Sequence, residues 1–162
     1  MAKKATKKKT EEEPLKLFYI FYNQERWDNW LKTLSEASFD ADPKSDEMPE
    51  GFRILDGFSV DITIEVLKIL KLYQNKRFSR EEALDKLAAV EAIVMSAPPK
   101  GDLEELVEIL QLPKLVLFGG SRKYISGEFD KDIKTLVKTG RAQIDKDMEL
   151  ALETASNIAA AV

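Results

Sequence analysis

Hydrophobic positions recur at helical spacing along most of this chain, and the first such stretch follows Asn23. Apolar side chains then fall three and four residues apart, at Trp27, Trp30, Leu31 and Leu34. That spacing predicts an amphipathic helix with one buried face. Asn23 precedes the stretch as a residue type that caps helix N-termini.

A polar stretch and a strongly apolar stretch come next. Residues 38–51 predict a loop because they are rich in turn formers, namely Asp40, Asp42, Pro43, Ser45, Asp46 and Pro49. Between 57 and 74 apolar residues cover most of a helical circumference, which predicts a central helix. Its β-branched residues leave a strand over 58–66 as an alternative, whereas Lys68 and Lys71 favour a helix in the second half.

Capping patterns mark the next two helix starts. Ser79 and Glu82 form a capping box, so a helix is predicted from Arg80, with Leu84, Leu87, Val90 and Val94 as its buried face. Asp102 and Glu105 repeat the pattern and predict a short helix that turns Leu103, Leu106, Val107 and Leu110 inward.

Pro113 suits the first turn of a further predicted helix over 114–126, which Gly127 would end. The last stretch, from Ile133 to Val162, keeps an apolar period of about 3.6 residues and predicts one long helix. Small residues in this stripe allow another helix to approach closely. Because the stripe stays apolar to the last residue, a homodimer through this helix is a further expectation.

The composition suits one globular domain, with 162 residues of which 44% are hydrophobic and 33% charged. We predict a single compact all-α domain of five to six helices over 15–162, with a long C-terminal helix. A lysine- and glutamate-rich tail over 1–14 is predicted to be disordered. The aromatic segment 15–22 is predicted as a short strand or an extended lead-in.

The chain contains neither histidine nor cysteine. This removes the commonest general base, the thiolate nucleophile and the usual ligands of zinc, haem and iron–sulfur sites. Carboxylates, lysines and hydroxyls remain, but no arrangement of them in the sequence resembles an active site. We therefore expect no enzyme, and no catalytic, cofactor-binding or metal-binding residue.

Charge is unevenly distributed along the chain. Met1–Glu13 carries five Lys and three Glu, a net charge of +2, and the remainder carries 20 Lys/Arg and 26 Asp/Glu, a net charge of −6. The five tail lysines are candidate phosphate contacts for RNA or the ribosome, against the alternative of a solvated tail; they are Lys3, Lys4, Lys7, Lys8 and Lys9. Glutamates follow them where a signal peptide needs an apolar run, and no run is long enough to span a membrane, so a cytoplasmic location without membrane insertion is expected.

Two motifs have a plain structural alternative. Gly119–Lys123 could bind phosphate through exposed backbone amides, but it lacks P-loop spacing, and glycines that let another helix approach are the favoured interpretation. Asp40, Asp42 and Asp46 match three positions of a calcium loop, but Gly51 stands where the bidentate Glu belongs, which favours a solvated loop. Acidic residues near the final helix read as a solvated face, namely Asp130, Asp132, Asp145, Asp147 and Glu149.

Six of the 14 aromatic residues, including both tryptophans, lie within thirteen positions. Exposed, they would form a protein-docking patch or stack on bases; buried, they would anchor the first helix, and the helical spacing favours burial. The candidate partner-binding residues are Phe18, Tyr19, Tyr22, Trp27 and Trp30.

The segment Phe21–Leu31 reads FYNQERWDNWL. It resembles the opening signature of a small archaeal family of unknown function, present in methanogens and halophilic archaea, and the similarity in helix order extends to about Gly127. The lysine tail and the long final helix lie outside this resemblance. The resemblance implies a cytoplasmic archaeal protein and transfers no catalytic or binding residues.

The expected function is a non-enzymatic accessory or regulatory factor that docks on a larger cytoplasmic protein complex. The alternative is a ribosome- or RNA-associated factor that binds through its lysine tail. An enzyme that uses carboxylates or tyrosine would need a cleft where such groups converge.

Overall fold

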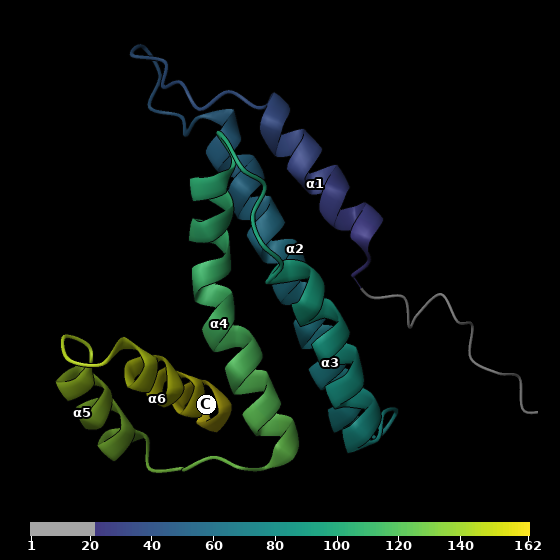
Figure 1. The fold of residues 1–162 in the computed structure, drawn as a ribbon, viewed down its shortest axis with the longest axis vertical. Coiled ribbons are helices and arrows are strands. Elements are labelled where there is room, and N and C mark those ends of the chain that lie inside the picture. The colour runs from purple at the N-terminus through teal and green to yellow at the C-terminus, as the bar shows by residue number, and fades with distance from the viewer. Residues whose placement is uncertain (1–21) are drawn as a thin grey trace, which may run out of the picture.

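A computed structural model describes residues 22–162, and these residues form six α-helices joined by turns and loops (Figure 1). The helices are α1 (Gln24–Glu36), α2 (Glu50–Gln74), α3 (Arg80–Val94), α4 (Glu104–Ser126), α5 (Ile133–Gln143) and α6 (Met148–Ala161). The all-α prediction is confirmed. The strand alternative over 58–66 is wrong, because those residues lie inside α2. The predicted tail over 1–14 and the segment 15–21 lie outside the described residues.

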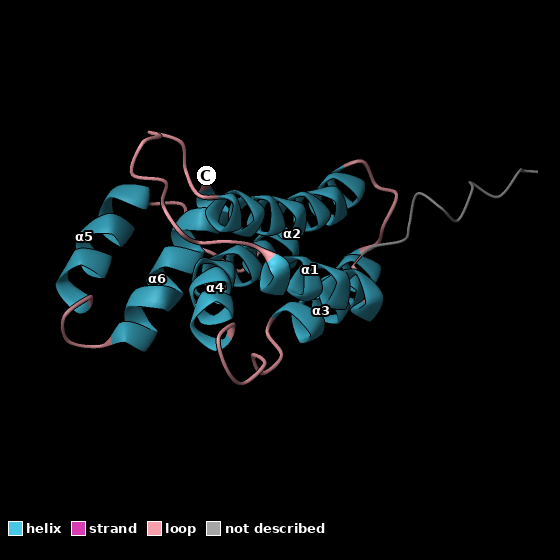
Figure 2. Ribbon diagram, turned by 90° about the horizontal axis from the view of Figure 1, so that it is seen from above, coloured by secondary structure: helices cyan, strands magenta, loops and turns pink. Residues whose placement is uncertain are grey.

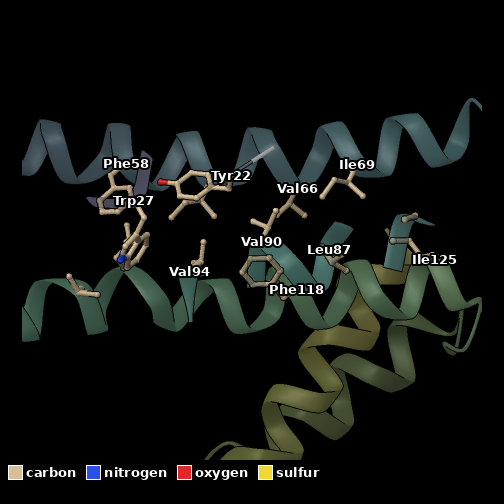
Figure 3. Close-up of a cluster of buried hydrophobic side chains, with 14 residues drawn as sticks. Tyr22, Trp27, Phe58, Val66, Ile69, Leu87, Val90, Val94, Phe118 and Ile125 are labelled. Carbon is tan, nitrogen blue, oxygen red and sulfur yellow. The ribbon is translucent and has the colours of Figure 1, made fainter. Parts of the chain in front are cut away.

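Helices α1 to α4 pack around one core of large apolar side chains, with α2 against α1, α3 and α4. Figure 3 shows side chains of α2 and α4 pointing toward each other across this core. Phe58, Ile62, Val66 and Ile69 line the buried face of α2, and Phe118 and Ile125 come from α4. Burial of this face, rather than helix propensity, is what holds a 25-residue helix that contains two glycines.

Two helix starts form as their capping residues predict. The backbone N–H of Arg26 donates to Asn23 Oδ1 at 2.8 Å, at the start of α1. At the start of α3, Glu82 N donates to Ser79 Oγ at 3.1 Å, and Ser79 N donates to Glu82 Oε2 at 2.8 Å. The capping box is therefore confirmed, and it satisfies two backbone donors that the helix leaves unpaired.

Helix α2 begins at Glu50, seven residues earlier than position 57. The cause is a tertiary contact of the preceding loop. The N–H of Gly51 donates to the carbonyl of Ser38 at 2.8 Å, and the ring of Phe39 covers Gly51 so closely that a Cβ would lie 2.6 Å from it. Glycine permits this approach and lowers helix propensity, so local sequence hides the early start.

Helix α4 is one continuous helix, and the prediction of a short helix followed by a second one after Pro113 is wrong. The predicted cap at Asp102 does not form, since the N-cap residue is Leu103 and no side chain caps it. Pro113 removes only one backbone hydrogen bond. Gln111 and Phe118, on either side of it, are both buried on the core side and hold the two halves in line.

The predicted long C-terminal helix is also wrong, because α5 and α6 are separate helices joined by a turn. Asp147 caps α6 by accepting from Leu150 N at 3.1 Å, and Asp132 caps α5 by accepting from Thr135 N at 3.2 Å. The apolar period continues across the turn because the two helices pack against each other, with Val137 and Gly140 of α5 partly buried. Across this contact Thr154 Oγ1 donates to Gln143 Oε1 at 2.8 Å.

The α5–α6 hairpin packs on α4 through small residues. A Cβ at Gly119 would lie 2.4 Å from Ser156 Oγ, and one at Gly120 would lie 2.7 Å from Ala159 Cβ. The interpretation of these glycines as a helix-packing surface is therefore confirmed. Figures 1 and 2 show α6 between α5 and α4, so α5 is the outermost helix on this side.

Candidate partner-binding groove

The predicted aromatic partner-binding residues do not gather on a described surface. Phe18 and Tyr19 lie outside the described residues, as do the five tail lysines. Tyr22 and Trp27 are buried in the core, with the Trp27 ring 5.0 Å from that of Phe58. Trp30 is half-buried and stacks on Phe58, with ring centroids 5.2 Å apart and planes 6° apart.

A polar cluster that the sequence did not predict fastens α1 to α2. Arg26 Nε donates to Asp61 Oδ2 at 2.9 Å, and its Nη1 donates to Glu65 Oε1 at 3.2 Å. The indole N–H of Trp30 donates to the same Asp61 oxygen at 2.8 Å. The hydrogen bond to Asp61 raises the pKa of Arg26, and burial together with Asp61 raises the pKa of Tyr22. Arg26, Asp61, Glu65 and the Trp30 indole pair with one another, so the cluster is structural. The buried Tyr22 hydroxyl has no hydrogen-bond partner among the described residues, and its ring lies 5.3 Å from the Arg26 guanidinium.

An apolar groove lies elsewhere, between the N-terminal halves of α2 and α4. It has a volume of about 650 Å³ and is open to solvent. Its lining residues are Met48, Phe52, Arg53, Leu55, Asp56, Ser59, Ile109, Leu110 and Pro113. Met48, Phe52 and Ile109 are large hydrophobic residues that are 58%, 44% and 55% exposed. Apolar lining with few polar groups is typical of ligand and peptide sites.

Behind Ser59 in the groove lies a buried lysine. Lys114 Nζ donates to the carbonyl and hydroxyl oxygens of Ser59, at 2.9 and 2.8 Å, and to Thr63 Oγ1 at 2.9 Å. Burial lowers the pKa of Lys114, and Asp56 opposes this shift. An amine beside a hydroxyl invites comparison with a Ser–Lys nucleophile pair. However, Ser59 lies in the interior of α2, where backbone amides bond within the helix and cannot stabilise an oxyanion.

Pro113 adds a polar feature to the groove wall. A proline has no N–H, so the carbonyl of Ile109, four residues earlier in α4, does not receive its usual helical hydrogen bond. Ile109 and Pro113 both line the groove.

The chain segments that form the walls of the groove are acidic in composition. Segments 46–60 and 104–115 carry seven Asp or Glu residues against only Arg53 and the buried Lys114. On α4, Glu105 and Glu108 are exposed beside Ile109. The field of these carboxylates favours a binding partner with positive charge near its apolar residues.

The other candidate sites have no site geometry. Within residues 22–162 no group of three or more His, Cys, Asp or Glu residues could hold a metal ion. Asp40, Asp42 and Asp46, which match three positions of a calcium loop, therefore do not form a metal site there. Gly119 and Gly120 face α6. The five acidic residues near the C-terminal helices are all exposed, as expected of a solvated face, and two of them, Asp132 and Asp147, also cap helices, a role that sequence reasoning missed.

The fold and the groove define a class: an all-α protein with a helical core and an exposed apolar groove between two of its helices. The chain belongs to a family described as uncharacterized proteins conserved in archaea (DUF2150), whose family model matches residues 20–162. The match continues beyond Gly127, where the expected resemblance ended, and so includes the α5–α6 hairpin.

No curated protein matches the chain, and no solved structure matches it either. Among the described helices, none is both long and apolar enough to cross a membrane.

Proposed function

We propose that this protein is a non-enzymatic accessory factor that docks on a larger protein complex in the archaeal cytoplasm, and that the α2–α4 groove is its docking site. The observation that carries the proposal is the exposure of Met48, Phe52 and Ile109 around one open apolar groove. Leaving such side chains in water is unfavourable, and a partner that covers them gains the free energy of their burial.

The groove also indicates what kind of segment binds. Its walls are two helices, so an amphipathic helix or an extended apolar peptide fits along them. The acidic composition of the segments that form its walls favours lysine or arginine beside the apolar anchors of that segment.

Two matched isoleucines provide the test. Ile109 in the groove is 55% exposed and Ile144, after α5, is 56% exposed, so Ile109→Asp and Ile144→Asp make the same change at equal exposure. Tagged wild-type and variant proteins are purified from native cells, and co-purifying proteins are quantified by mass spectrometry. We expect Ile109→Asp to reduce specific partners at least about tenfold and Ile144→Asp to leave them unchanged. Equal retention by both variants would overturn the groove as the docking site.

A ribonuclease arm separates the alternative function. Partners that bind through the groove should survive ribonuclease and moderate salt. Ribosomal material that is lost on either treatment, and on deletion of residues 1–10, would instead support binding of RNA through the tail lysines.

A further inference from the structure

A second apolar surface lies on α2 and faces away from the core. Val60, Ile64 and Leu67 are 48%, 54% and 52% exposed. They are spaced four and three residues apart, so they form one stripe along the helix. The core uses the other side of α2, through Phe58 and Ile62. Figure 2 shows α2 along one edge of the bundle, with α1, α3 and α4 to its other side.

This stripe is distinct from the groove. On a helix of 3.6 residues per turn, Phe52 lies roughly 80° around the axis from Val60. Beside the stripe is a shallow hollow of about 570 Å³, lined by Ile64, Leu67, Lys68, Leu70, Lys71 and Gln74. An apolar side chain from another molecule can enter this hollow while its helix lies along α2.

The outer face of α2 is complementary to itself when two copies run antiparallel. The positions on this face, in order, are Arg53, Asp56, Val60, Ile64, Leu67, Lys71 and Gln74. A two-fold axis near Ile64 places Val60 opposite Leu67 of the second copy, and Ile64 opposite its own equivalent. The same axis places Asp56 opposite Lys71, once at each end of the apolar stripe.

The charges select the antiparallel arrangement. In a parallel pair Asp56 would face Asp56 and Lys71 would face Lys71, and like charges repel. In the antiparallel pair both contacts join opposite charges. Asp56 and Lys71 are exposed in the single chain, so both are accessible to a second molecule.

We propose that the protein is a homodimer in which the two α2 helices pair antiparallel through Val60, Ile64 and Leu67, with Asp56 and Lys71 paired at both ends. This interface differs from the expected one, which used the C-terminal helix. It leaves Phe52 and Ile109 of each copy outside the apolar contact, whereas Asp56, which also lines the groove, takes part in the dimer contact.

The first experiment measures the molar mass of the full chain by light scattering and sedimentation over a range of concentrations. We expect a dimer whose dissociation constant rises at least about tenfold in Ile64→Asp, because an unpaired carboxylate would be buried at the two-fold axis. Ile109→Asp is the matched control, with the same change at a similarly exposed isoleucine in the groove. It should remain dimeric, so failure of the docking proposal and failure of this one are distinguishable. A wild-type monomer at every concentration, or a dimer that Ile64→Asp does not weaken, would overturn the proposal.

A charge exchange and a cysteine cross-link test the geometry. Asp56→Lys should weaken the dimer, and adding Lys71→Asp should restore it, because the exchanged charges are again opposite across the interface.

The chain has no native cysteine, so a single Ile64→Cys variant reports on contact at the axis. Under mild oxidation it should form a disulfide-linked dimer faster than Ile109→Cys does. Absence of charge rescue together with equal cross-linking of the two cysteine variants would contradict the antiparallel arrangement.

Discussion

The two parts of the described fold are held together by different kinds of contact. In the α1–α4 bundle, large side chains such as Trp27, Phe58 and Phe118 fill a common core. In the α5–α6 hairpin, α5 has no buried residue, and the buried residues of α6 are Thr154, Ser156 and Ala160. The bundle therefore gains stability from the area that it buries, whereas the hairpin depends on close backbone approach.

This difference predicts how each part fails. Loss of a large core residue removes contacts shared by four helices, so the bundle should unfold as a unit. Added volume on the contact between α4 and α6 should displace the hairpin while the bundle core stays intact. Stability measurements on single variants can separate the two responses.

The largest expected effect is in the bundle core. Phe58→Ala removes a ring with no solvent exposure that contacts both Trp27 and Trp30. We expect a loss of about 3–5 kcal/mol in the free energy of unfolding, from lost burial and the cavity left behind. Urea titrations followed by tryptophan fluorescence and by circular dichroism should move together. A loss below about 1 kcal/mol would contradict the assignment of Phe58 to the centre of the core.

The next effect compares two glycines in helix interiors. Gly120→Ala places a Cβ 2.7 Å from Ala159 Cβ, whereas Gly57→Ala places one 3.5 Å from the Trp30 ring, an ordinary contact. We expect Gly120→Ala to destabilise the attachment of the hairpin by about 1–3 kcal/mol. Gly57→Ala should stabilise the protein by about 0.5–1 kcal/mol, because alanine has the higher helix propensity.

Limited trypsin digestion measures where the Gly120→Ala effect falls. Lys138 and Arg141 of α5 should be cut sooner in this variant, while the fluorescence of the bundle tryptophans is unchanged. If both glycine variants behave alike, close packing of α6 on Gly120 is wrong and propensity alone decides the result.

The same contrast explains which features could be predicted from sequence. Ser79 with Glu82, and Asn23 before a stripe of apolar residues, are local signals, and the structure confirms both helix starts. The start of α2 and the continuity of α4 depend on tertiary contacts of Gly51 and of residues around Pro113, which no local pattern records. The break between α5 and α6 was hidden because two helices that face each other can continue one apolar period.

The groove was harder to predict from the sequence than the capped helix starts. The predicted inward face around 103–110 did not include Ile109, and Leu112 was likewise unassigned; both are exposed. Apolar residues left over by a predicted core are therefore the signal that could have found it. Phe52 gave no such signal, because the loop was expected to extend to residue 51 and α2 to begin only at 57.

Buried polar groups offer a smaller, pH-dependent contrast. In the hairpin they are hydroxyls of Thr154 and Ser156, which bond to carbonyls of their own helix and do not titrate in the accessible range. In the bundle, burial lowers the pKa of Lys114 below its ordinary value of 10.5. The unfolded chain therefore binds more protons than the folded one between the lowered pKa and 10.5.

It follows that the free energy of unfolding should rise with pH through this window, and Lys114→Met should remove that rise. The measurement is the difference between wild type and Lys114→Met in urea titrations at several alkaline pH values, which cancels the titration of other groups. A difference that is constant with pH would contradict the assigned shift. At each pH, the protection of the hairpin amides against hydrogen exchange should be the same in wild type and in Lys114→Met.

The smallest effect compares one capping hydrogen bond in each part. Ser79→Ala and Asp147→Ala each remove a side chain that accepts from a backbone N–H at a helix start, at 3.1 Å in both cases. Each lost cap should cost about 1 kcal/mol.

Helix α3 contributes Ala83, Leu87, Val90 and Val94 to the shared core, so the cost of Ser79→Ala should appear in the global free energy of unfolding. Helix α6 is held through small residues on α4, so the cost of Asp147→Ala should appear as faster hydrogen exchange confined to 148–161 and leave the global midpoint unchanged. An equal shift of the global midpoint in both variants would mean that the hairpin and the bundle unfold as one cooperative unit.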